Sequence, residues 1–411
     1  MNASAIRSRI AALEEQPGCL YLHCDMDNYY AKIEELYNPA LKTIPFAVCG
    51  DPRMRHKLVM SKNSVAKAAG VPTGISFIQA KEICPTLKYI KANPHRYIKH
   101  TELIRSVFHK YSDIVIPYSQ DEAWINIGVV SYREAEQIAD LIRIEILYSL
   151  ELSVSIGVSF NLLFSKIGSD YRKPNSVTVI THNNYQEMVW PLPANDLLFV
   201  GDFRKNVLLQ AGINTIGDIA NANPMKMAEL LNKPGYELWK FANGDDSTFK
   251  PTGPIGSIGH AITPPADLCN NVDVSAVIYM LATAVCERLR KHSVRTTCVK
   301  ISMIDSNFNK TIRQSSFKIA SDNVNYVFSK AYDLFTKHYK WHLPIRSIGV
   351  CASNLDRMWQ LTLIPEEDVK LSIDIDARIK RLVERLGSIA IEKSVAIRDD
   401  YDYRIPSEIA L

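Results

Sequence analysis

The sequence lacks any long apolar run, any internal repeat and any low-complexity tract. None of its apolar stretches, over 411 residues, approaches the roughly 20 residues needed to cross a bilayer. Residues 1–16 are amphipathic and charged, and they lack the apolar centre of a signal peptide. We therefore expect neither a membrane-spanning nor an exported protein.

Closely spaced cysteines are also missing. The eight cysteines form no C-x-x-C pair, so their spacing supports neither a zinc site nor a disulfide framework. Each lies in or beside an apolar stretch. This placement favours buried, reduced thiols and a cytoplasmic protein.

The net charge is small, at +4, and by itself indicates no charged partner. Its distribution is uneven, because residues 251–350 hold 12 Lys or Arg against 6 Asp or Glu. A local basic excess is expected where a protein meets phosphate groups. A solvated basic face that binds nothing fits the same count.

Length and composition indicate a folded chain of several domains, with 47% hydrophobic and 22% charged residues. The first block, to about residue 175, alternates strand-like and helix-like segments. Strands are predicted at 19–27, 46–50, 87–92 and 152–159, and an amphipathic helix is predicted at 132–151. This pattern predicts an α/β or α+β unit.

The rest of the chain changes character twice. Residues 181–244 read as short helices separated by Gly and Pro, and a Pro- and Gly-rich linker follows. In the last block, helices are predicted at 275–291 and 324–339, and strands at 297–305 and 346–355. These elements predict a small sheet backed by two helices, followed by a charged tail.

Two acidic pairs carry the strongest chemical signal. Asp25 and Asp27 are two residues apart on a predicted strand, so they share a face. Asp121 and Glu122 precede an alternating strand, after a turn at Ser119-Gln120. Oxygen ligands of this kind suit Mg²⁺, and two ions about 3.5–4 Å apart clamp the oxygens of a phosphoryl transfer. Either pair alone also fits ordinary turn residues or solvated charges.

Four segments in a fixed order indicate a family. They are "HCDMDNYYAKIE" (23–34), "PYSQDEAW" (117–124), "GVSFNLLFSKIGSDYRKPN" (157–175) and "GINTIGDIA" (212–220). This series closely resembles the Y-family translesion DNA polymerases, and the likeness runs from about Tyr21 to Leu355.

The resemblance implies an α+β multi-domain fold, a right hand with a helix-hairpin-helix thumb and a little finger of sheet plus two helices. The implied domains are palm (1–28 and 93–180), fingers (29–92), thumb (181–246), linker (247–258), little finger (259–355) and tail (356–411). The predicted thumb departs from the family pattern, because Phe199-Val200 stands where the first hairpin glycine is usual.

The resemblance also assigns the metal site. Asp25, Asp121, Glu122 and the main-chain carbonyl of Met26 are expected to hold two Mg²⁺ ions, whereas Asp27 matches a residue that is not usually a direct ligand.

The nucleotide is expected to lie beside these carboxylates. The backbone N–H of Tyr29 would meet the triphosphate, and the ring of Tyr30 would act as a steric gate that leaves no room for a 2′-hydroxyl. Ser61, Lys67 and Lys173 match positions that contact the triphosphate.

Three positions of these motifs depart from the family. The family usually has Tyr at Ser64, Arg at Lys67 and Lys at Leu162. A lysine at position 67 supplies a point charge in place of a bidentate guanidinium.

The expected function is low-fidelity, template-directed DNA synthesis in the bypass of damaged DNA. The expected partners of this monomer are primer-template DNA, gripped by basic residues such as Arg288, Arg290, Lys300 and Arg313, and deoxynucleoside triphosphates. Gln360–Ile364 ("QLTLI") resembles the peptide that docks bacterial polymerases on the sliding clamp. Two alternatives stay open, a non-catalytic protein that binds DNA or recruits the clamp, and a nucleotide cyclase.

Overall fold

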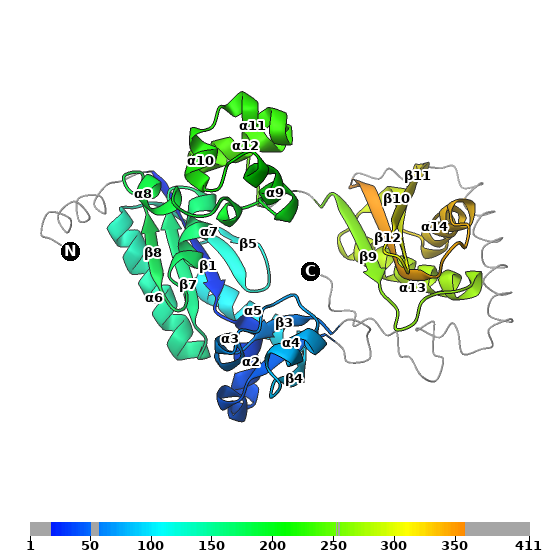
Figure 1. Cartoon of the computed structure of the whole chain (residues 1–411), viewed down its shortest axis with the longest axis horizontal. Helices are drawn as coiled ribbons and strands as arrows, with labels where there is room; N and C mark the ends of the chain where they lie inside the picture. The colour runs from blue at the N-terminus through cyan, green and yellow to red at the C-terminus, as the bar shows by residue number, and fades with distance from the viewer. Residues whose placement is uncertain (1–17, 51–56, 252, 254, 358–411) are drawn as a thin grey trace, which may run out of the picture. The chain divides into compact units, whose positions relative to one another are not determined.

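The computed structural model describes residues 18–50, 57–251, 253 and 255–357. They form two compact units, the first of residues 18–49 and 59–251 and the second of residues 50, 57–58, 253 and 255–357 (Figure 1). No helix in the described part of the chain is long and apolar enough to span a bilayer. All eight cysteines are free thiols. The prediction of an α+β multi-domain fold is confirmed.

A five-stranded sheet forms the centre of the first unit, in the order β5-β6-β1-β7-β8. Its strands are β1 (Cys19–Met26), β5 (Val115–Pro117), β6 (Glu122–Val129), β7 (Val154–Ser159) and β8 (Val177–Ile180). The middle strand, β1, runs antiparallel to β6 and β7. Its side chains alternate between the two faces of the sheet, as a strand requires.

Helices cover both faces of this sheet. They are α5 (Pro94–Phe108), α6 (Tyr132–Leu150) and α7 (Leu162–Tyr171). Leu20, Leu22 and Cys24 share a core with α5 and α6, whereas His23 faces α7. Because both faces are covered, the successive residues Ala123 to Ile125 are all buried, where an alternating pattern was expected.

The residues predicted as fingers form a separate three-stranded sheet in the order β3-β2-β4. Its elements are α2 (Tyr29–Tyr37), η1 (Pro39–Thr43), β2 (Phe46–Cys49), β3 (Val59–Lys62), α3 (Ser64–Ala68), α4 (Phe77–Ile83) and β4 (Lys88–Lys91). The predicted strands at 46–50 and 87–92 are confirmed as β2 and β4. A small core of its own includes Val59, Ala80 and Leu87.

Short helices follow, as the Gly and Pro spacing predicts. They are α8 (Tyr185–Val189), η2 (Ala194–Asp196), α9 (Asp202–Gln210), α10 (Ile216–Asn221), α11 (Pro224–Leu231) and α12 (Lys233–Ala242). Their side chains surround a core that includes Leu208, Ile219 and Phe241. Gly212, at φ +77°, makes the turn between α9 and α10, a conformation that glycine adopts without strain.

The second unit is an antiparallel sheet in the order β11-β10-β12-β9, backed by two helices. Its elements are β9 (Ser257–Ile262), α13 (Asn271–Lys291), β10 (Arg295–Asp305), β11 (Lys310–Ser321), α14 (Val324–His338) and β12 (Ile345–Asp356). The predicted sheet with two helices is confirmed.

Several boundaries in this unit differ from the expected ones, among them the start of α13 and the end of the linker. The helix α13 begins four residues early, because the Asn270 side chain accepts the N–H groups of Val272 and Asp273. The strand β9 begins inside the predicted linker, since Ile258 pairs with Ala352 and is buried. The division of the chain into palm, fingers, thumb, linker and little finger stays a prediction. The Gln360–Ile364 peptide lies outside the described residues.

Candidate active site

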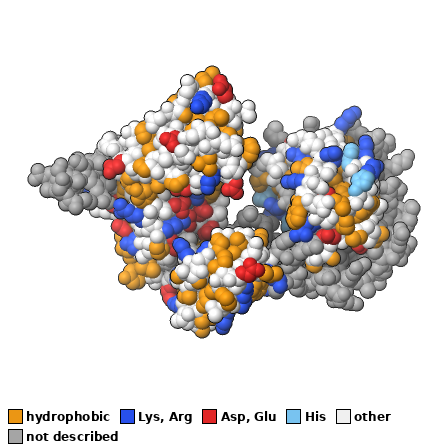
Figure 2. Space-filling model, in the orientation of Figure 1, with side chains coloured by type: hydrophobic (Ala, Val, Ile, Leu, Met, Phe, Trp, Pro, Cys, Tyr) orange, Lys and Arg blue, Asp and Glu red, His pale blue; other side chains and the backbone are white. Residues whose placement is uncertain are grey.

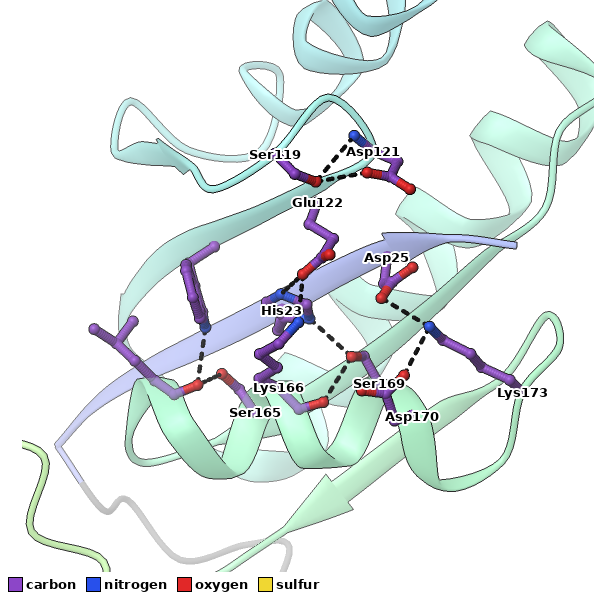
Figure 3. Close-up of polar contacts among 12 residues, drawn as sticks. His23, Asp25, Ser119, Asp121, Glu122, Ser165, Lys166, Ser169, Asp170 and Lys173 are labelled. Carbon is purple, nitrogen blue, oxygen red and sulfur yellow. Dashed lines mark hydrogen bonds and ion pairs between the residues drawn. The ribbon is translucent and has the colours of Figure 1, made fainter. Parts of the chain in front are cut away.

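Three acidic residues meet where β1 ends and β6 begins. Asp25 and Glu122 face each other across the antiparallel pair of strands, although 97 positions separate them in the sequence. The Met26 N–H donates to the Asp121 carbonyl at 3.1 Å, which joins the loop before β6 to the end of β1. Figure 3 shows Asp25 and Glu122 projecting from these neighbouring strands, with Asp121 beside them.

Asp25 is buried and paired with a lysine. Lys173 Nζ lies 2.7 Å from Asp25 Oδ2 and 2.8 Å from Asp170 Oδ1, so one ammonium bridges two carboxylates. Burial raises the pKa of Asp25 to about 7, against the opposing charge of Lys173, and the nearby Glu122 adds to the rise. Asp25 is therefore a buried carboxylate whose ionised form Lys173 stabilises only in part.

Glu122 has the opposite balance. Burial acts to raise its pKa, but contacts with His23 and Lys166 outweigh that effect and lower the pKa to about 2. Lys166 Nζ forms a short ion pair with Glu122 Oε2, and His23 Nε2 lies 3.3 Å from the same oxygen. Glu122 is thus fully ionised at neutral pH.

The loop before β6 is held in place by hydrogen bonds. The Ser119 hydroxyl donates to Asp121 Oδ1 at 2.5 Å and accepts the Asp121 N–H at 3.3 Å. The Thr101 hydroxyl donates to the Gln120 carbonyl at 2.9 Å, and an Arg105 N–H donates to the Ser119 carbonyl. The helix α5 therefore supports the position of Asp121.

The oxygen atoms of the three acidic residues and of the Met26 carbonyl are suitable ligands for a hard divalent cation. The set consists of carboxylate and carbonyl oxygens, and the nearest thiol in sequence, Cys24, is buried on the other face of β1. In the part of the chain that the structure describes, no three His, Cys, Asp or Glu side chains are arranged so that they could hold a metal ion. Lys166 and Lys173 instead pair with two of the carboxylates and balance their charge.

Asp27 is separate from this group. It is buried, accepts the Ser155 hydroxyl at 2.9 Å and accepts the Asn175 N–H at 2.8 Å. These bonds tie the end of β1 to β7 and to the loop after α7. A structural role follows, in keeping with the expectation that Asp27 is not a ligand.

The two tyrosines begin α2, directly after the strand end. Asn28 turns the chain at φ 50°, and the buried Tyr29 hydroxyl donates to the Tyr97 carbonyl at 2.8 Å. The Tyr30 ring is half-buried, with its centre 4.7 Å from that of Tyr97. Its hydroxyl lies 3.4 Å from Gln120 Oε1, so this ring stands beside the loop that carries Asp121.

The two predicted phosphate contacts of residues 59–68 lie on other elements. Ser61 is buried on β3, opposite Val48, and Lys67 is exposed in the last turn of α3. No contact among the described residues joins either one to the carboxylates. Burial and the charge of Lys67 together lower the pKa of Lys62, a second ammonium that the sequence interpretation missed.

The hairpin between η2 and α10 carries a strained residue. Phe199 adopts φ 74°, a left-handed conformation that favours glycine, at the place where the family usually has one. The centre of its ring lies 6.1 Å from that of Phe241 and 5.6 Å from that of Phe249. A cavity of about 720 Å³ lies between the segment 195–201 and α7, and Lys166 and Asp170 line it.

Three of the four basic residues expected to grip DNA make contacts within the second unit, and one of them, Arg313, donates to the carbonyl of its neighbour Ile312 at 2.8 Å. Arg288 donates to the Gly259 carbonyl and Arg290 donates to the Asp322 carbonyl, both at 3.0 Å. Lys300 lies on the face of β10 away from the helices, and Arg313 is exposed on β11. Figure 2 shows acidic side chains gathered on the visible face of the first unit, and Lys and Arg spread over that of the second.

The sequence interpretation missed His23 and Ser169. The signal was present, because Tyr21, His23 and Asp25 alternate on one face of a strand whose other face is apolar. What the sequence does not contain is the partner of this face, which is α7.

Residues 24–170 match the model of the impB/mucB/samB family, and residues 256–363 match the model of its C-terminal domain. The chain is 38% identical to DNA polymerase IV of Acetivibrio thermocellus over 388 residues, 92% of this chain and 97% of the relative. It is 28% identical to DNA polymerase IV 1 of Bacillus subtilis over 391 residues, 93% of this chain and 94% of the relative.

Among solved structures, a Y-family DNA polymerase chimera of Dbh and Dpo4 aligns with a TM-score of 0.73 at 23% identity, over 82% of this chain and 99% of that one. An insertion ternary complex of Dbh DNA polymerase aligns with a TM-score of 0.57 at 22% identity over the same shares of the two chains. At these identities the structural likeness concerns the fold.

Proposed function

The chain belongs to the impB/mucB/samB family, and we propose that it is a low-fidelity, template-directed DNA polymerase that extends primer 3′ ends past damaged bases. The observation that carries the proposal is the meeting of Asp25, Asp121 and Glu122 at one strand end, beside two lysines and two tyrosines. Its substrates are deoxynucleoside triphosphates and primer-template DNA.

Asp25, Asp121, Glu122 and the Met26 carbonyl would hold the divalent ions on which this family depends, and we propose two Mg²⁺. When bound, such ions lower the pKa of the primer hydroxyl and offset the charge that develops on the departing pyrophosphate. Glu122 is ionised, and Asp121 is held in place by its hydrogen bond with Ser119, so both offer carboxylate oxygens as ligands to the ions. Asp25 is the donor whose charge most needs a cation, because burial disfavours its ionised form.

The protein's own groups position the nucleotide. Lys173 reaches Asp25 and Asp170 from the loop after α7, so it is placed to exchange a carboxylate for a phosphate oxygen. The backbone N–H of Tyr29 lies in the first turn of α2, where helix N–H groups favour anions. Lys67, near Lys62, would add positive charge to the triphosphate site, and the small Ser61 would leave room beside the base pair.

Tyr30 would select the sugar. Its ring is held against Tyr97 and beside the loop that carries Asp121, so it has little freedom to move away from a 2′-hydroxyl. Exclusion of this kind acts by steric conflict with the ribonucleotide rather than by attraction of the deoxynucleotide.

Further partners follow from the sequence. We propose that Gln360–Ile364 docks on the sliding clamp, and that the polymerase acts as a monomer in the cytoplasm, in keeping with its free thiols. Basic residues of the second unit, such as the half-buried Lys300 and the exposed Arg313, would bind the duplex through its phosphates.

Primer extension on intact and lesion-bearing templates tests this function. The double variant Asp121→Ala, Glu122→Ala should lose at least about 10³-fold in rate, because metal ligation contributes several kcal/mol to the transition state. Asp113→Ala, an exposed carboxylate of the same unit, is the matched control and should extend normally. Normal extension by the double variant would refute the metal assignment. Release of pyrophosphate without DNA would instead indicate a cyclase, and a wild-type protein that binds DNA without extending it would indicate a non-catalytic role.

A further inference from the structure

After α12 the chain returns from the short helices to the sheet of the first unit. The Asp246 carboxylate accepts the Leu162 N–H at 2.8 Å, and the Asn161 side-chain amide donates to the Gly244 carbonyl at 2.9 Å. Both bonds join residues 244–246 to the start of α7, which packs on β1 and β7. The segment that follows α12 is therefore attached to the sheet that carries the candidate active site.

Phe249 lies further along this segment, between the rings of two other elements. Its ring centre is 5.7 Å from that of Trp124 and 5.6 Å from that of Phe199, and both pairs meet edge to face. This is a favoured arrangement of aromatic rings. Trp124 is completely buried on β6, two residues after Glu122, whereas Phe199 lies in the turn between η2 and α9. We call Trp124, Phe249 and Phe199 the aromatic bridge.

Phe199 keeps a strained backbone at one end of this bridge. Its φ of 74° is one that glycine adopts easily and phenylalanine does not. Strain of this kind persists only where the surrounding structure holds it. Here Arg204 donates to the Phe199 carbonyl at 2.7 Å, and the rings of Phe241 and Phe249 contact the side chain. A glycine at this position would avoid the strain but would leave Phe249 without its partner in the turn.

The turn that holds Phe199 is one wall of the cavity beside the candidate metal site. Residues 195–201 line one side of this cavity of about 720 Å³, and Lys166 and Asp170 of α7 line the other. Lys166 pairs with Glu122, so the cavity adjoins the carboxylates. A primer end bound at these carboxylates would lie beside the cavity, and the position of the turn would then affect how the DNA fits.

We propose that Phe249 is a positioning residue: through the aromatic bridge it holds residues 197–201 in place before DNA binds, and this raises the affinity for primer-template. The part of the inference that concerns DNA rests on the proposed function. A segment that is already ordered loses less freedom when its ligand binds, so a preformed turn lowers the cost of binding. Phe249 is not among the residues proposed to hold the metal ions or the nucleotide, so the rate at saturating DNA should not depend on it.

Phe249→Ala removes the middle ring of the bridge. We expect the dissociation constant for primer-template to rise by about 3–10-fold, the loss typical of groups that must be ordered on binding. The kcat of single-nucleotide insertion at saturating DNA should stay the same. Phe249→Tyr keeps the ring and should restore the affinity, because a cavity of about 440 Å³ beside Phe249 has room for the hydroxyl.

Phe199→Gly tests the bridge from its other end. Glycine adopts a positive φ without strain, so in the absence of a bridge this change should leave DNA binding unaltered. We expect it instead to weaken DNA binding as much as Phe249→Ala does, and the double variant to bind no more weakly than either single variant. Phe203→Ala is the matched control and should keep wild-type affinity, because Phe203 is a nearby phenylalanine on α9 that is 77% exposed.

Hydrogen exchange, followed by mass spectrometry on the full-length protein without DNA, measures the turn directly. The Val200 N–H donates to the Leu197 carbonyl at 3.1 Å, and residues 197–201 should exchange faster in Phe249→Ala than in the wild type. Strand β7 is the internal reference, because a general loss of stability would accelerate exchange there as well. Fluorescence anisotropy measures the DNA affinity of each variant.

Unchanged exchange in residues 197–201, or unchanged DNA affinity, in Phe249→Ala would overturn the inference, and so would effects that multiply in the double variant. If Phe249→Ala does not fold, Phe199→Gly decides by the same two measurements, since the Phe199 side chain is 43% exposed and its loss leaves no buried cavity. A wild-type protein that binds DNA but extends no primer would refute the proposed function alone, because exchange and affinity are measured without DNA synthesis.

Discussion

The five-stranded sheet of the first unit and the four-stranded sheet of the second unit are each covered by helices, but the two contacts are built differently. In the first unit, α7 lies on the sheet through a glycine contact, and a Cβ on Gly168 would come within 2.9 Å of the Gly157 Cα. In the second unit, α13 and α14 lie on their sheet through large apolar side chains such as Leu281 and Phe335. We call the first the narrow contact and the second the wide contact.

The difference explains why the candidate active-site residues lie in the first unit and why exposed lysines lie on the sheet of the second. In the narrow contact the helix comes close enough for short polar side chains to reach polar groups of the strands, and Ser169 reaches the ring of His23 in this way. In the wide contact, bulky side chains fill the space and provide stability. The other face of that sheet stays free for charged residues such as Lys300 and Lys310. A carboxylate that binds a metal needs exact placement, whereas phosphate binding by surface lysines tolerates variation.

The largest expected effect comes from a methyl group in the narrow contact. Gly157→Ala forces Cβ against the backbone of α7, which is less able to shift than a side chain. We expect the stability of the first unit to fall by about 1–3 kcal/mol, the usual cost of overpacking. Primer extension should fall by about 100-fold, since displacements near 1 Å have such effects on rates. Urea unfolding measures the loss of stability, and single-nucleotide insertion measures the loss of rate.

Gly256→Ala is the matched control, because a Cβ there meets nothing within 4 Å. It should match the wild type in both measurements. Wild-type extension by Gly157→Ala would mean that the close approach of α7 is not needed for catalysis, and the comparison of the two contacts would lose its main consequence.

A smaller effect is expected on the outer face of the second unit. The double variant Lys300→Ala, Lys310→Ala removes two ammonium groups from the face of the sheet opposite the helices. The slope of log binding constant against log salt should fall by about 2, roughly one for each phosphate group that the variant no longer neutralises. Fluorescence anisotropy with a primer-template at several salt concentrations measures this slope, and the maximal rate at saturating DNA should stay the same. An unchanged slope would mean that these lysines bind no phosphate.

The sequence predicted individual strands and helices better than it predicted the contacts between them. The strand around Asp25 and the helix from Tyr132 follow from local patterns, and the structure confirms them. Asp25 and Glu122 face each other because of the register between two strands that are distant in the sequence. Only the family resemblance suggested that these two residues lie together. Their role as metal ligands stays a prediction.

His23 and Gly157 illustrate what local patterns leave out. The sequence places His23 on the polar face of its strand and Gly157 between Ile156 and Val158, but it does not show what packs against either residue. The two residues are opposite in the register, and α7 lies across both. Phe199 is a similar case. The sequence shows that a phenylalanine replaces the usual glycine of the family, but only the structure shows its positive φ and its ring contact with Phe249.

The smallest expected effect sharpens the comparison by removing one methylene group from the wide contact. Ile301 is completely buried under the helices of the second unit, and Ile301→Val should cost about 0.5–1.5 kcal/mol of stability. Because this side chain only fills space, the rate of extension should not change at a temperature where the variant is folded. Urea unfolding followed by circular dichroism, together with single-nucleotide insertion, checks both expectations. If the rate of Ile301→Val fell by as much as that of Gly157→Ala, the wide contact would also be setting the geometry of the active site, and stability and chemistry would not be divided between the two sheets.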